Sequence, residues 1–233
     1  QEAYIPNFFC KAYRPVLYIP SKEEVKELLQ KMDIRTSHNS EQFRLDRECK
    51  ILFLLYFCCG LRLSEGRLLK WEHIDLDKGI LTVLGSKGNK DRLVYLPQDS
   101  LPVLKNYKER QEMLFPGIDW AFPGKDPHKP VSCSGVESSF NRHWAMLPVA
   151  KTVDKHPTPH CLRHAFVVER FNEWMHQGID TNTMLPYLSR YLGHKSPDET
   201  YYYYHLAEKA FDTIREKDSV SGKVIPEVIP YEE

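Results

Sequence analysis

Apolar residues recur at helical spacing in the first part of the chain. The first series follows a capping box in which Ser21 is the N-cap residue and Glu24 reaches back to it. The second series runs over residues 41–59, where apolar residues return every three or four positions and Gly60 supplies a stop. The pattern therefore predicts two helices, the second of them amphipathic and buried.

The pattern becomes β-like in the middle of the chain. Residues 79–84 and 92–96 are rich in branched and aromatic side chains and flank a polar loop with two glycines. These segments predict a hairpin whose loop carries Lys87 and Lys90. A short strand is also expected at residues 120–122.

Helices are expected again in the second half of the chain. Capping boxes at Ser134 and Ser196 open two of them, and Gly178 and Gly193 close two others. The predicted ranges are 100–114, 134–147, 161–177, 184–192, a helix from 197 that carries Tyr201 to Tyr204, and 208–217.

These elements predict a mainly α fold with a small antiparallel β-sheet. Residues 1–17 show no period and are expected to be an extended linker or arm, and the main domain is expected to cover residues 18–217. The remaining residues, 218–233, form a C-terminal tail rich in Val, Ile and Pro. Because the chain opens with Gln-Glu-Ala and no initiator Met, we expect it to be a piece of a longer protein.

Composition narrows the class of protein. The chain has 233 residues, of which 42% are hydrophobic and 27% charged, as in a globular protein rather than a disordered one. Its strongest apolar run, 51–59, is far shorter than the roughly 20 residues of a spanning helix, so no membrane association is expected. The six cysteines form no CxxC pair, and we expect free thiols in a reducing cytosol. Because 32 basic residues balance 32 acidic ones, net charge neither indicates nor excludes nucleic acid.

Four stretches concentrate reactive side chains at the expected ends of elements. They are residues 60–65, the loop at 87, residues 160–164 and residues 192–203. Together they supply Arg, Lys, His and Tyr, without the carboxylate cluster that a metal site would need. Such a set suits phosphate chemistry, because guanidinium groups hold non-bridging oxygens, a Lys protonates a leaving alkoxide and a Tyr acts as nucleophile.

In order and spacing these stretches resemble the four signature boxes of the tyrosine recombinases, the phage-integrase family of DNA-cutting and DNA-joining enzymes. The resemblance spans about residues 18–215, with boxes at 60–65 (GLRLSE), 85–96 (GSKGNKDRLVYL), 159–166 (PHCLRHAF) and 192–206 (LGHKSPDETYYYYHL). It implies that residues 18–217 are a mainly helical catalytic domain with a small sheet. It also implies DNA cleavage through a covalent 3′-phosphotyrosyl intermediate, without metal, ATP or other cofactor.

The resemblance assigns roles to individual residues. Two arginines would clamp the phosphate, two histidines would assist them, and the lysine on the hairpin would be the general acid for the 5′-oxygen. The nucleophile would be Tyr203, which follows His194 by nine residues, while Tyr202 and Tyr204 remain alternatives and Lys90 competes with Lys87. The predicted catalytic residues are Arg62, Lys87, His160, Arg163, His194 and Tyr203.

The resemblance also implies partners. Double-stranded DNA would be the substrate, and the protein would assemble into a synaptic dimer or tetramer on it, in the bacterial cytoplasm and nucleoid. Integration and excision of a mobile element is the favoured role, and tail 218–233 could dock on a neighbouring protomer. Candidate phosphate or base contacts come from Lys90, Arg92, Arg142 and Lys195.

Other interpretations stay open on the residues alone. The same chemistry serves a DNA-relaxing enzyme of the type IB topoisomerase kind, and a non-catalytic DNA-binding module is a second alternative. A nucleophilic Cys161 and a zinc site are disfavoured, the first by its apolar helical setting and the second by the absence of metal-ligand spacing. His164 is expected to be structural, and Gly66 departs from the bulkier residue that the family often has there.

Overall fold

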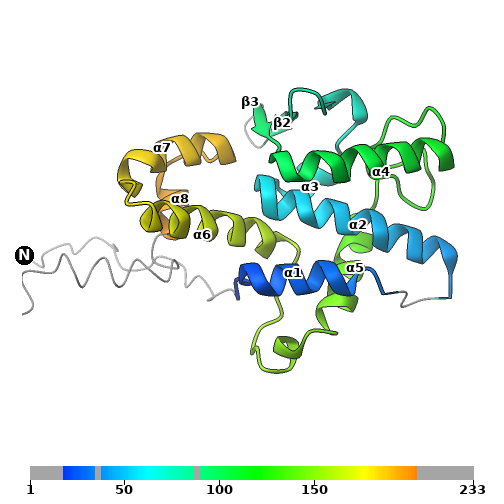
Figure 1. The fold of residues 1–233 in the computed structure, drawn as a ribbon, viewed down its shortest axis with the longest axis horizontal. Coiled ribbons are helices and arrows are strands. Elements are labelled where there is room, and N and C mark those ends of the chain that lie inside the picture. The colour runs from blue at the N-terminus through cyan, green and yellow to red at the C-terminus, as the bar shows by residue number, and fades with distance from the viewer. Residues whose placement is uncertain (1–17, 35–37, 87–89, 204–233) are drawn as a thin grey trace, which may run out of the picture.

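Helix α2 (Ser40–Cys59) is the central element of the computed structural model, which describes residues 18–34, 38–86 and 90–203 (Figure 1). Helices α1, α3, α4, α5 and α6 all contact α2. The remaining elements include three strands, so the predicted fold class, mainly α with a small antiparallel sheet, is confirmed. The helices are α1 (Lys22–Lys31), α3 (Leu63–Arg67), α4 (Leu101–Leu114), α5 (Cys133–Trp144), α6 (His160–His176), α7 (Thr181–Leu192) and α8 (Asp198–Tyr201).

The two helices predicted first have the expected ends. In α1, Ser21 and Glu24 form the reciprocal capping box. In α2, the Asn39 side chain accepts hydrogen bonds from two first-turn backbone N–H groups, and Gly60 ends the helix with a φ of 63°. A left-handed residue of this kind suits glycine, because other side chains are strained there. The position of Gly60 also fixes where the following Arg62 leaves the helix.

The sheet has the order β1-β2-β3, with both pairs antiparallel. β2 (Ile80–Ser86) and β3 (Lys90–Tyr95) form the predicted hairpin, in which Leu81 faces Val94 across the ladder and both side chains are buried. β1 (Ile74–Asp75) was not predicted, since two residues show no period. The strand expected at 120–122 is wrong, because Trp120 makes only an isolated bridge with Lys70.

Helix α3 was also absent from the predictions. It is a single turn in which Gly66 is buried against α2. A Cβ atom at this position would lie 2.8 Å from a methyl carbon of Leu52, which is closer than side-chain carbons approach. The glycine thus allows α3 to pack tightly on α2, which accounts for its departure from the bulkier family residue.

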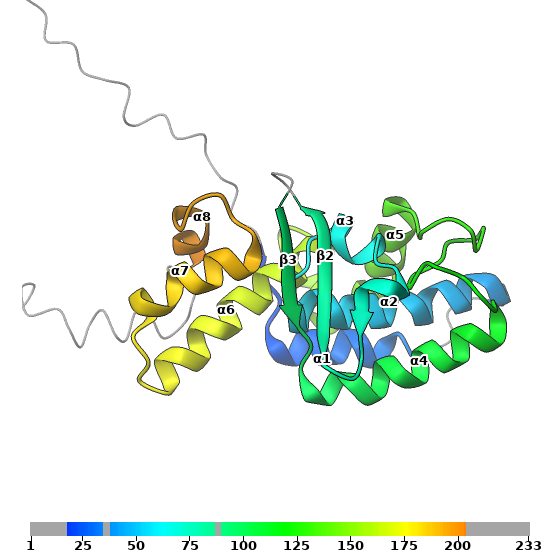
Figure 2. The ribbon, with the colours of Figure 1, turned by 90° about the horizontal axis from the view of Figure 1, so that it is seen from above.

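Helices α6, α7 and α8 form a group at one end of the molecule, beside the hairpin (Figures 1 and 2). They enclose a second apolar cluster, which contains Phe166, Phe171, Leu188, Leu192 and Tyr203. The first and larger cluster lies around α2 and the sheet. The C-terminal end of α2, the N-terminal turn of α6 and the C-terminal end of α7 meet where the two clusters join.

Three helix starts differ from the predictions. The N-cap of α5 is Ser132, two residues before the expected cap at Ser134, because Ser132 is extended and its hydroxyl accepts from Gly135 N at 3.0 Å. α7 begins at Thr181 rather than 184, because Asp180 caps it. α8 is a short helix in which Pro197 occupies the N-cap position. In each case a polar side chain or proline outside the apolar period sets the boundary.

Several predictions concern residues outside the described ranges. These are the arm 1–17, the general acid Lys87, the alternative nucleophile Tyr204, the helix 208–217 and the tail 218–233.

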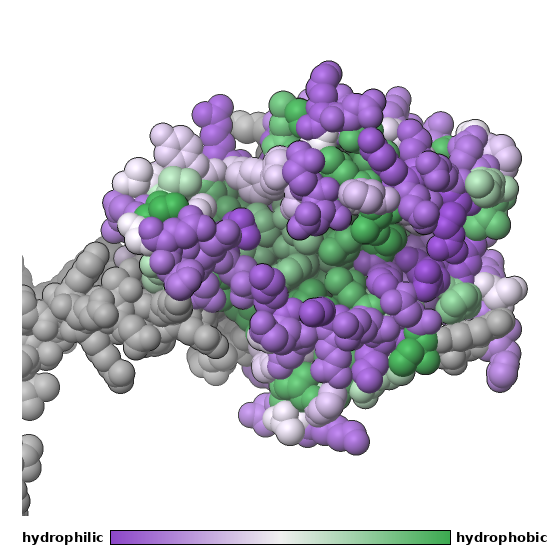
Figure 3. Space-filling view, viewed as in Figure 1, coloured by the Kyte–Doolittle hydropathy of each residue, from purple (hydrophilic) through white to green (hydrophobic). Residues whose placement is uncertain are grey.

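The face shown in Figure 3 is largely polar, with an apolar hollow near its centre. Within the described ranges the five cysteines are free, and no helix combines the length and hydropathy needed to cross a bilayer.

Candidate active site

Arg163 joins three chain segments at the junction of the two clusters. Its guanidinium, 2% exposed, donates to the carbonyl of Gly60 at 2.6 Å and to the carbonyl of Leu192 at 2.8 Å. Those carbonyls lie at the ends of α2 and α7. The next polar side chains along the chain are Arg62 and His194, so anchoring Arg163 also places these two residues beside it.

Glu65 holds the arginines in place. Its buried carboxylate accepts from Arg62 Nη1 at 2.8 Å and from both Nη groups of Arg92 at 2.8 and 2.7 Å, while Arg163 Nη1 lies 3.9 Å away. Although burial opposes ionisation, hydrogen bonds from Arg92 and Arg62 lower the pKa of Glu65 to about 2. Arg62 also donates to the Gly193 carbonyl at 2.7 Å, so its position is fixed from both sides.

His194 contacts Arg163 directly. The His194 Nε2 atom lies 3.1 Å from Arg163 Nη2, and its Nδ1 lies 2.7 Å from Thr200 Oγ1. Burial first, then Arg163 and Arg62, lowers the pKa of His194 to about 4. The neutral ring must accept at Nε2, because a guanidinium only donates, and therefore donates from Nδ1 to Thr200. His194 thus connects the α7 end to α8.

Two histidines occupy successive turns at the start of α6. His160 is the first residue of the helix and is exposed, and the His164 ring lies edge-on to it with centroids 4.6 Å apart. Partial removal from water and the nearby Arg163 lower the pKa of His160. Burial and the neighbouring His160 lower the pKa of His164 to about 3, so this ring is neutral at neutral pH.

Tyr203 points inward from the end of α8. Its side chain is 7% exposed, whereas Tyr201 is 44% exposed on the same turn. The Tyr203 hydroxyl is hydrogen-bonded to His164 Nδ1, and Tyr202 packs edge-on against the Tyr203 ring at 5.6 Å. The Tyr203 hydroxyl is therefore hydrogen-bonded within the cluster of histidines and arginines.

The structure brings most of the predicted residues together. Arg62, His160, Arg163, His194 and Tyr203 all lie at this junction, whereas Lys87 lies outside the described ranges. Their catalytic roles stay a prediction.

The predicted DNA contacts fall in different places. Arg92 lies inside the site, where it bonds Glu65 and donates to the Tyr191 carbonyl at 2.9 Å. Arg142 lies on α5, paired with the buried Asp46 at 2.6 Å. Lys195 is exposed directly after His194, and Lys90 opens β3. Contact with DNA stays a prediction for all four.

Sequence reasoning gave no role to Glu65, treated His164 as structural and named Arg92 only as a DNA contact. Glu65 follows Arg62 by three positions, a spacing that places both on one face of a helical turn. His164 follows His160 by four positions, which is the same kind of signal, and its predicted structural role stays untested. The supporting role of Arg92 had no local signal, because its partner Glu65 lies 27 positions away.

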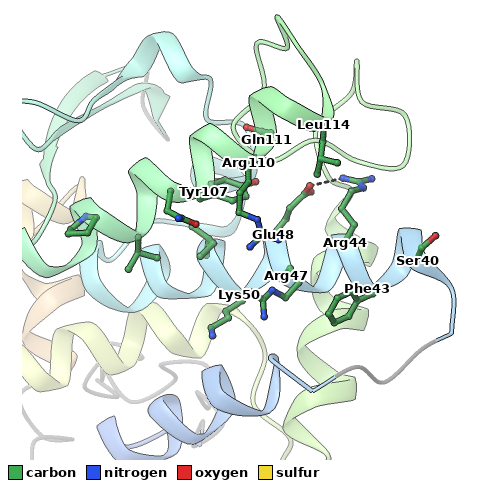
Figure 4. A pocket seen from close by; sticks show the side chains of 14 residues that line it. Ser40, Phe43, Arg44, Arg47, Glu48, Lys50, Tyr107, Arg110, Gln111 and Leu114 are labelled. Carbon is green, nitrogen blue, oxygen red and sulfur yellow. Dashed lines mark hydrogen bonds and ion pairs between the residues drawn. The ribbon is translucent and has the colours of Figure 1, made fainter.

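One cavity borders the cluster, and a separate pocket lies away from it. A cavity of about 280 Å³ lies between Arg62 and β2 at the edge of the cluster. A separate pocket of about 520 Å³, between α2 and α4, contains none of the predicted catalytic residues; the carboxyl of Glu48 lies in it, bound to Arg44 at 2.7 Å (Figure 4). In the described part of the chain, no three His, Cys, Asp or Glu side chains lie together as metal ligands.

Sequence comparison places the chain among known proteins. The sequence profile of the phage integrase family matches residues 21–210. A protein of Sinorhizobium fredii named integrase/recombinase y4rB is 30% identical over 211 residues, which cover 84% of this chain and 63% of y4rB. The tyrosine recombinase XerA of Pyrococcus furiosus is 31% identical over 191 residues, covering 81% of this chain and 57% of XerA. The chain thus spans less than two thirds of the length of these relatives.

Structural comparison supports the same fold. A complex of the XerH site-specific recombinase with its difH substrate after cleavage superposes with a TM-score of 0.65 at 22% identity, over 85% of this chain and 52% of that one. The Tn1549 transposon integrase, solved with a circular intermediate DNA, superposes with a TM-score of 0.62 at 16% identity, over 88% of this chain and 66% of that one.

Proposed function

The chain belongs to the phage integrase family, and on that basis we propose that it is the catalytic part of a site-specific tyrosine recombinase. It cleaves and rejoins double-stranded DNA during integration and excision of mobile DNA. The observation that carries the proposal is the convergence on Arg163: this buried cation fixes the ends of α2 and α7, and with them Arg62 and His194. Tyr203 lies at the same junction, through its bond to His164.

In the proposed reaction the Tyr203 oxygen attacks the phosphorus of one DNA strand. The bond from phosphorus to the 5′-oxygen breaks, and its electron pair stays on that oxygen, which Lys87 protonates. Arg62 and Arg163 bind the non-bridging oxygens, and His160 and His194 line the same position. Because the phosphotyrosyl ester retains the energy of the broken bond, a 5′-hydroxyl from another strand can attack it and release Tyr203.

Preorganisation of the cations supports this proposal. Glu65 is ionised and bridges Arg62 and Arg92, so the guanidinium groups are fixed before DNA arrives. A cluster fixed in this way avoids reorganisation when negative charge develops on the phosphate. The phosphate oxygens would add to these contacts rather than replace them.

The proposal includes the assembly. We infer that residues 18–217 form the catalytic domain, that it acts as a synaptic dimer or tetramer on bacterial nucleoid DNA in the cytoplasm, and that tail 218–233 docks on a neighbouring protomer. Exposed Lys195, with Lys90, would contact DNA phosphates near the site. Deletion of residues 218–233 without any change in assembly or cleavage would contradict the role of the tail.

A cleavage assay tests the proposed function. The full chain is incubated with nicked duplexes made from the DNA that flanks its gene, and the denatured products are separated on a gel. A covalent protein–DNA band is expected, because a nick lets the short 5′-hydroxyl fragment diffuse away. Absence of the band on every duplex that the chain binds would favour a non-catalytic DNA-binding module. Relaxation of supercoiled plasmid without recombinant products would favour the topoisomerase-like alternative.

A further inference from the structure

We propose that His164 is the proton acceptor for Tyr203 during strand cleavage. This inference rests on the proposed function, because it assigns the general base of that reaction. No role in catalysis was expected for this histidine from the sequence. The evidence is its position against the hydroxyl of the predicted nucleophile.

The contact between the two side chains is direct and enclosed. The Tyr203 hydroxyl is hydrogen-bonded to His164 Nδ1, and the two rings lie with centroids 5.2 Å apart. Tyr203 is 7% exposed and His164 is 8% exposed. Because so little of either side chain meets solvent, the ring nitrogen replaces water as the acceptor for the phenol.

The surrounding contacts fix His164 in this position. It follows Arg163, whose guanidinium is anchored to the Gly60 and Leu192 carbonyls, so the first turn of α6 is held firmly. The His160 ring lies edge-on to His164 at an interplanar angle of 84° and limits its rotation. A base held within hydrogen-bond reach of the proton that it abstracts satisfies the first requirement of general base catalysis.

The neighbouring His194 is already occupied. Its Nε2 accepts from Arg163 and its Nδ1 lies against Thr200, so both ring nitrogens have partners in the present arrangement. Nδ1 of His164, by contrast, has the nucleophile itself as its partner. This difference favours His164 over His194 as the acceptor.

The protonation state fits an acceptor role. Burial, followed by the neighbouring His160, Arg163 and His194, keeps the His164 ring neutral at neutral pH. In the proposed tautomer the Nδ1 of this neutral ring carries no proton, so it accepts the hydrogen bond that the Tyr203 hydroxyl donates. A bound phosphodiester would bring negative charge beside Arg163 and offset part of the field that weakens this base. The basicity of His164 would therefore rise when substrate binds.

The proposed step balances without a co-reactant. The proton of Tyr203 moves to His164 Nδ1, which becomes an imidazolium, while the Tyr203 oxygen bonds to phosphorus and the 5′-oxygen leaves. In the rejoining step a 5′-hydroxyl attacks, the bond from phosphorus to Tyr203 breaks, and His164 returns its proton to the phenol oxygen. The base is restored at the end of each cycle.

Nitrogen NMR on the full chain tests the required tautomer without DNA. With ¹⁵N-labelled histidine, and with His164→Asn used to assign the signal, we expect a proton-free Nδ1 and a protonated Nε2 on His164 at pH 7. A proton on Nδ1 would overturn the inference, because that nitrogen could not accept from the phenol. A doubly protonated ring at pH 7 would overturn it as well.

Cleavage kinetics test the proton transfer itself. His164→Asn places an amide oxygen where Nδ1 lies, so it can keep the hydrogen bond but cannot accept the proton. We expect adduct formation on nicked duplex to slow by about 100-fold or more in this variant and in His164→Ala, as for loss of a general base. The control, Tyr201→Phe on the exposed face of the same turn, should stay within about threefold of the unmodified chain.

A second substrate separates the base from the general acid. In a duplex with a sulfur atom at the 5′-bridging position, the leaving thiolate needs no proton, so a variant that lacks the acid is rescued. We expect no rescue of His164→Asn on this duplex. Rescue of His164→Asn on the sulfur-containing duplex would overturn the inference. On the ordinary nicked duplex, it would be overturned if His164→Asn formed adduct within tenfold of the unmodified rate, or if either His164 variant cleaved faster than the unmodified chain. If the unmodified chain itself forms no adduct, the proposed function fails, and the inference fails with it.

Discussion

Glu65 and Arg92 are joined in a two-pronged ion pair, with Arg92 Nη1 2.8 Å from one carboxylate oxygen and Nη2 2.7 Å from the other. The same carboxylate accepts from Arg62 and lies near Arg163. Two parallel N–H bonds fix orientation as well as distance. The pair therefore connects the hairpin to the turn that carries Arg62, and it aligns the cations of the site.

Replacement of this carboxylate should disable the site. Glu65→Gln leaves several guanidinium groups close together without their counter-charge, and we expect a loss of about 3–5 kcal/mol of stability, as for a broken buried pair. Cleavage should fall by at least tenfold even at temperatures where the variant is folded. Thermal unfolding and adduct formation measure the two effects, and Glu72→Gln, an exposed carboxyl, is the control.

The stability difference between the native chain and Glu65→Gln should depend on pH in a defined direction. The pKa of Glu65 is lowered from 4.5 to about 2 in the folded chain, so its ionised form stabilises the fold above pH 4.5. That contribution is lost as the pH falls from 4.5 towards 2. The stability difference between the native chain and Glu65→Gln should shrink over this interval, and a constant difference would contradict the assignment.

The close approach at Gly60 gives a second prediction. A Cβ atom there would lie 2.6 Å from a ring carbon of Phe166, and the residue has a φ of 63°. Gly178 has a similar φ of 69° but no atom within 4 Å of the same position. Gly60→Ala should thus lose more stability than Gly178→Ala, whose loss is the backbone strain of about 1 kcal/mol.

The rate of DNA cleavage should also be affected more by Gly60→Ala than by Gly178→Ala. The Gly60 carbonyl accepts from Arg163, so a shift of this residue moves the central arginine. We expect slower adduct formation in Gly60→Ala and an unchanged rate in Gly178→Ala. Equal melting temperatures and equal rates would show that the approach of Gly60 to Phe166 is unimportant.

Glu48 should control stability at neutral pH without affecting cleavage. Burial raises the pKa of this carboxyl from 4.5 to about 7, although Arg44 opposes the shift (Figure 4). The contribution of protonated Glu48 to the free energy of unfolding is fully present below pH 4.5 and is lost as the pH rises to 7. Glu48→Gln keeps an oxygen for Arg44 and avoids the buried charge. Its advantage in the free energy of unfolding should be absent at pH 4.5 and reach up to about 3 kcal/mol above pH 7.

Arg142 and Lys195 should behave differently when they are replaced. Arg142 pairs with Asp46, which is 2% exposed, so Arg142→Ala leaves a buried charge and should lose about 3 kcal/mol of stability. The double change Arg142→Ala with Asp46→Asn should recover part of it. Lys195→Ala should leave stability unchanged and weaken DNA binding, with the salt dependence reduced by about one phosphate contact. If Arg142→Ala weakened DNA binding and Lys195→Ala did not, the DNA contact would lie on α5 instead.

The sequence predicts the parts of the fold that are set by local chemistry. The capping box at Ser21, the stop at Gly60 and the presence of the hairpin all depend on side chains a few positions apart. The starts of α5 and α7 are harder to predict from the sequence, because Ser132 and Asp180 compete with other capping residues nearby. A single-turn helix such as α3 is too short to show a period at all.

The network of the site could not be derived in the same way. Arg163 binds Gly60 across 103 positions, and Tyr203 binds His164 across 39 positions. Such contacts depend on how α2, α6 and α7 pack, and no local pattern encodes it. The order of the motifs identified which residues to consider, whereas the contacts of Glu65 with Arg92 and of His164 with Tyr203 became visible only in three dimensions.

Mapping the residue that becomes attached to DNA tests the central claim most directly. The full chain is trapped on nicked duplex, digested and analysed by peptide mass, alongside Tyr203→Phe, Tyr202→Phe and Tyr204→Phe. We expect the adduct on Tyr203, its loss in Tyr203→Phe and its retention in the other two variants. An adduct on Tyr202 or Tyr204, or one that survives in Tyr203→Phe, would contradict the assignment of the nucleophile.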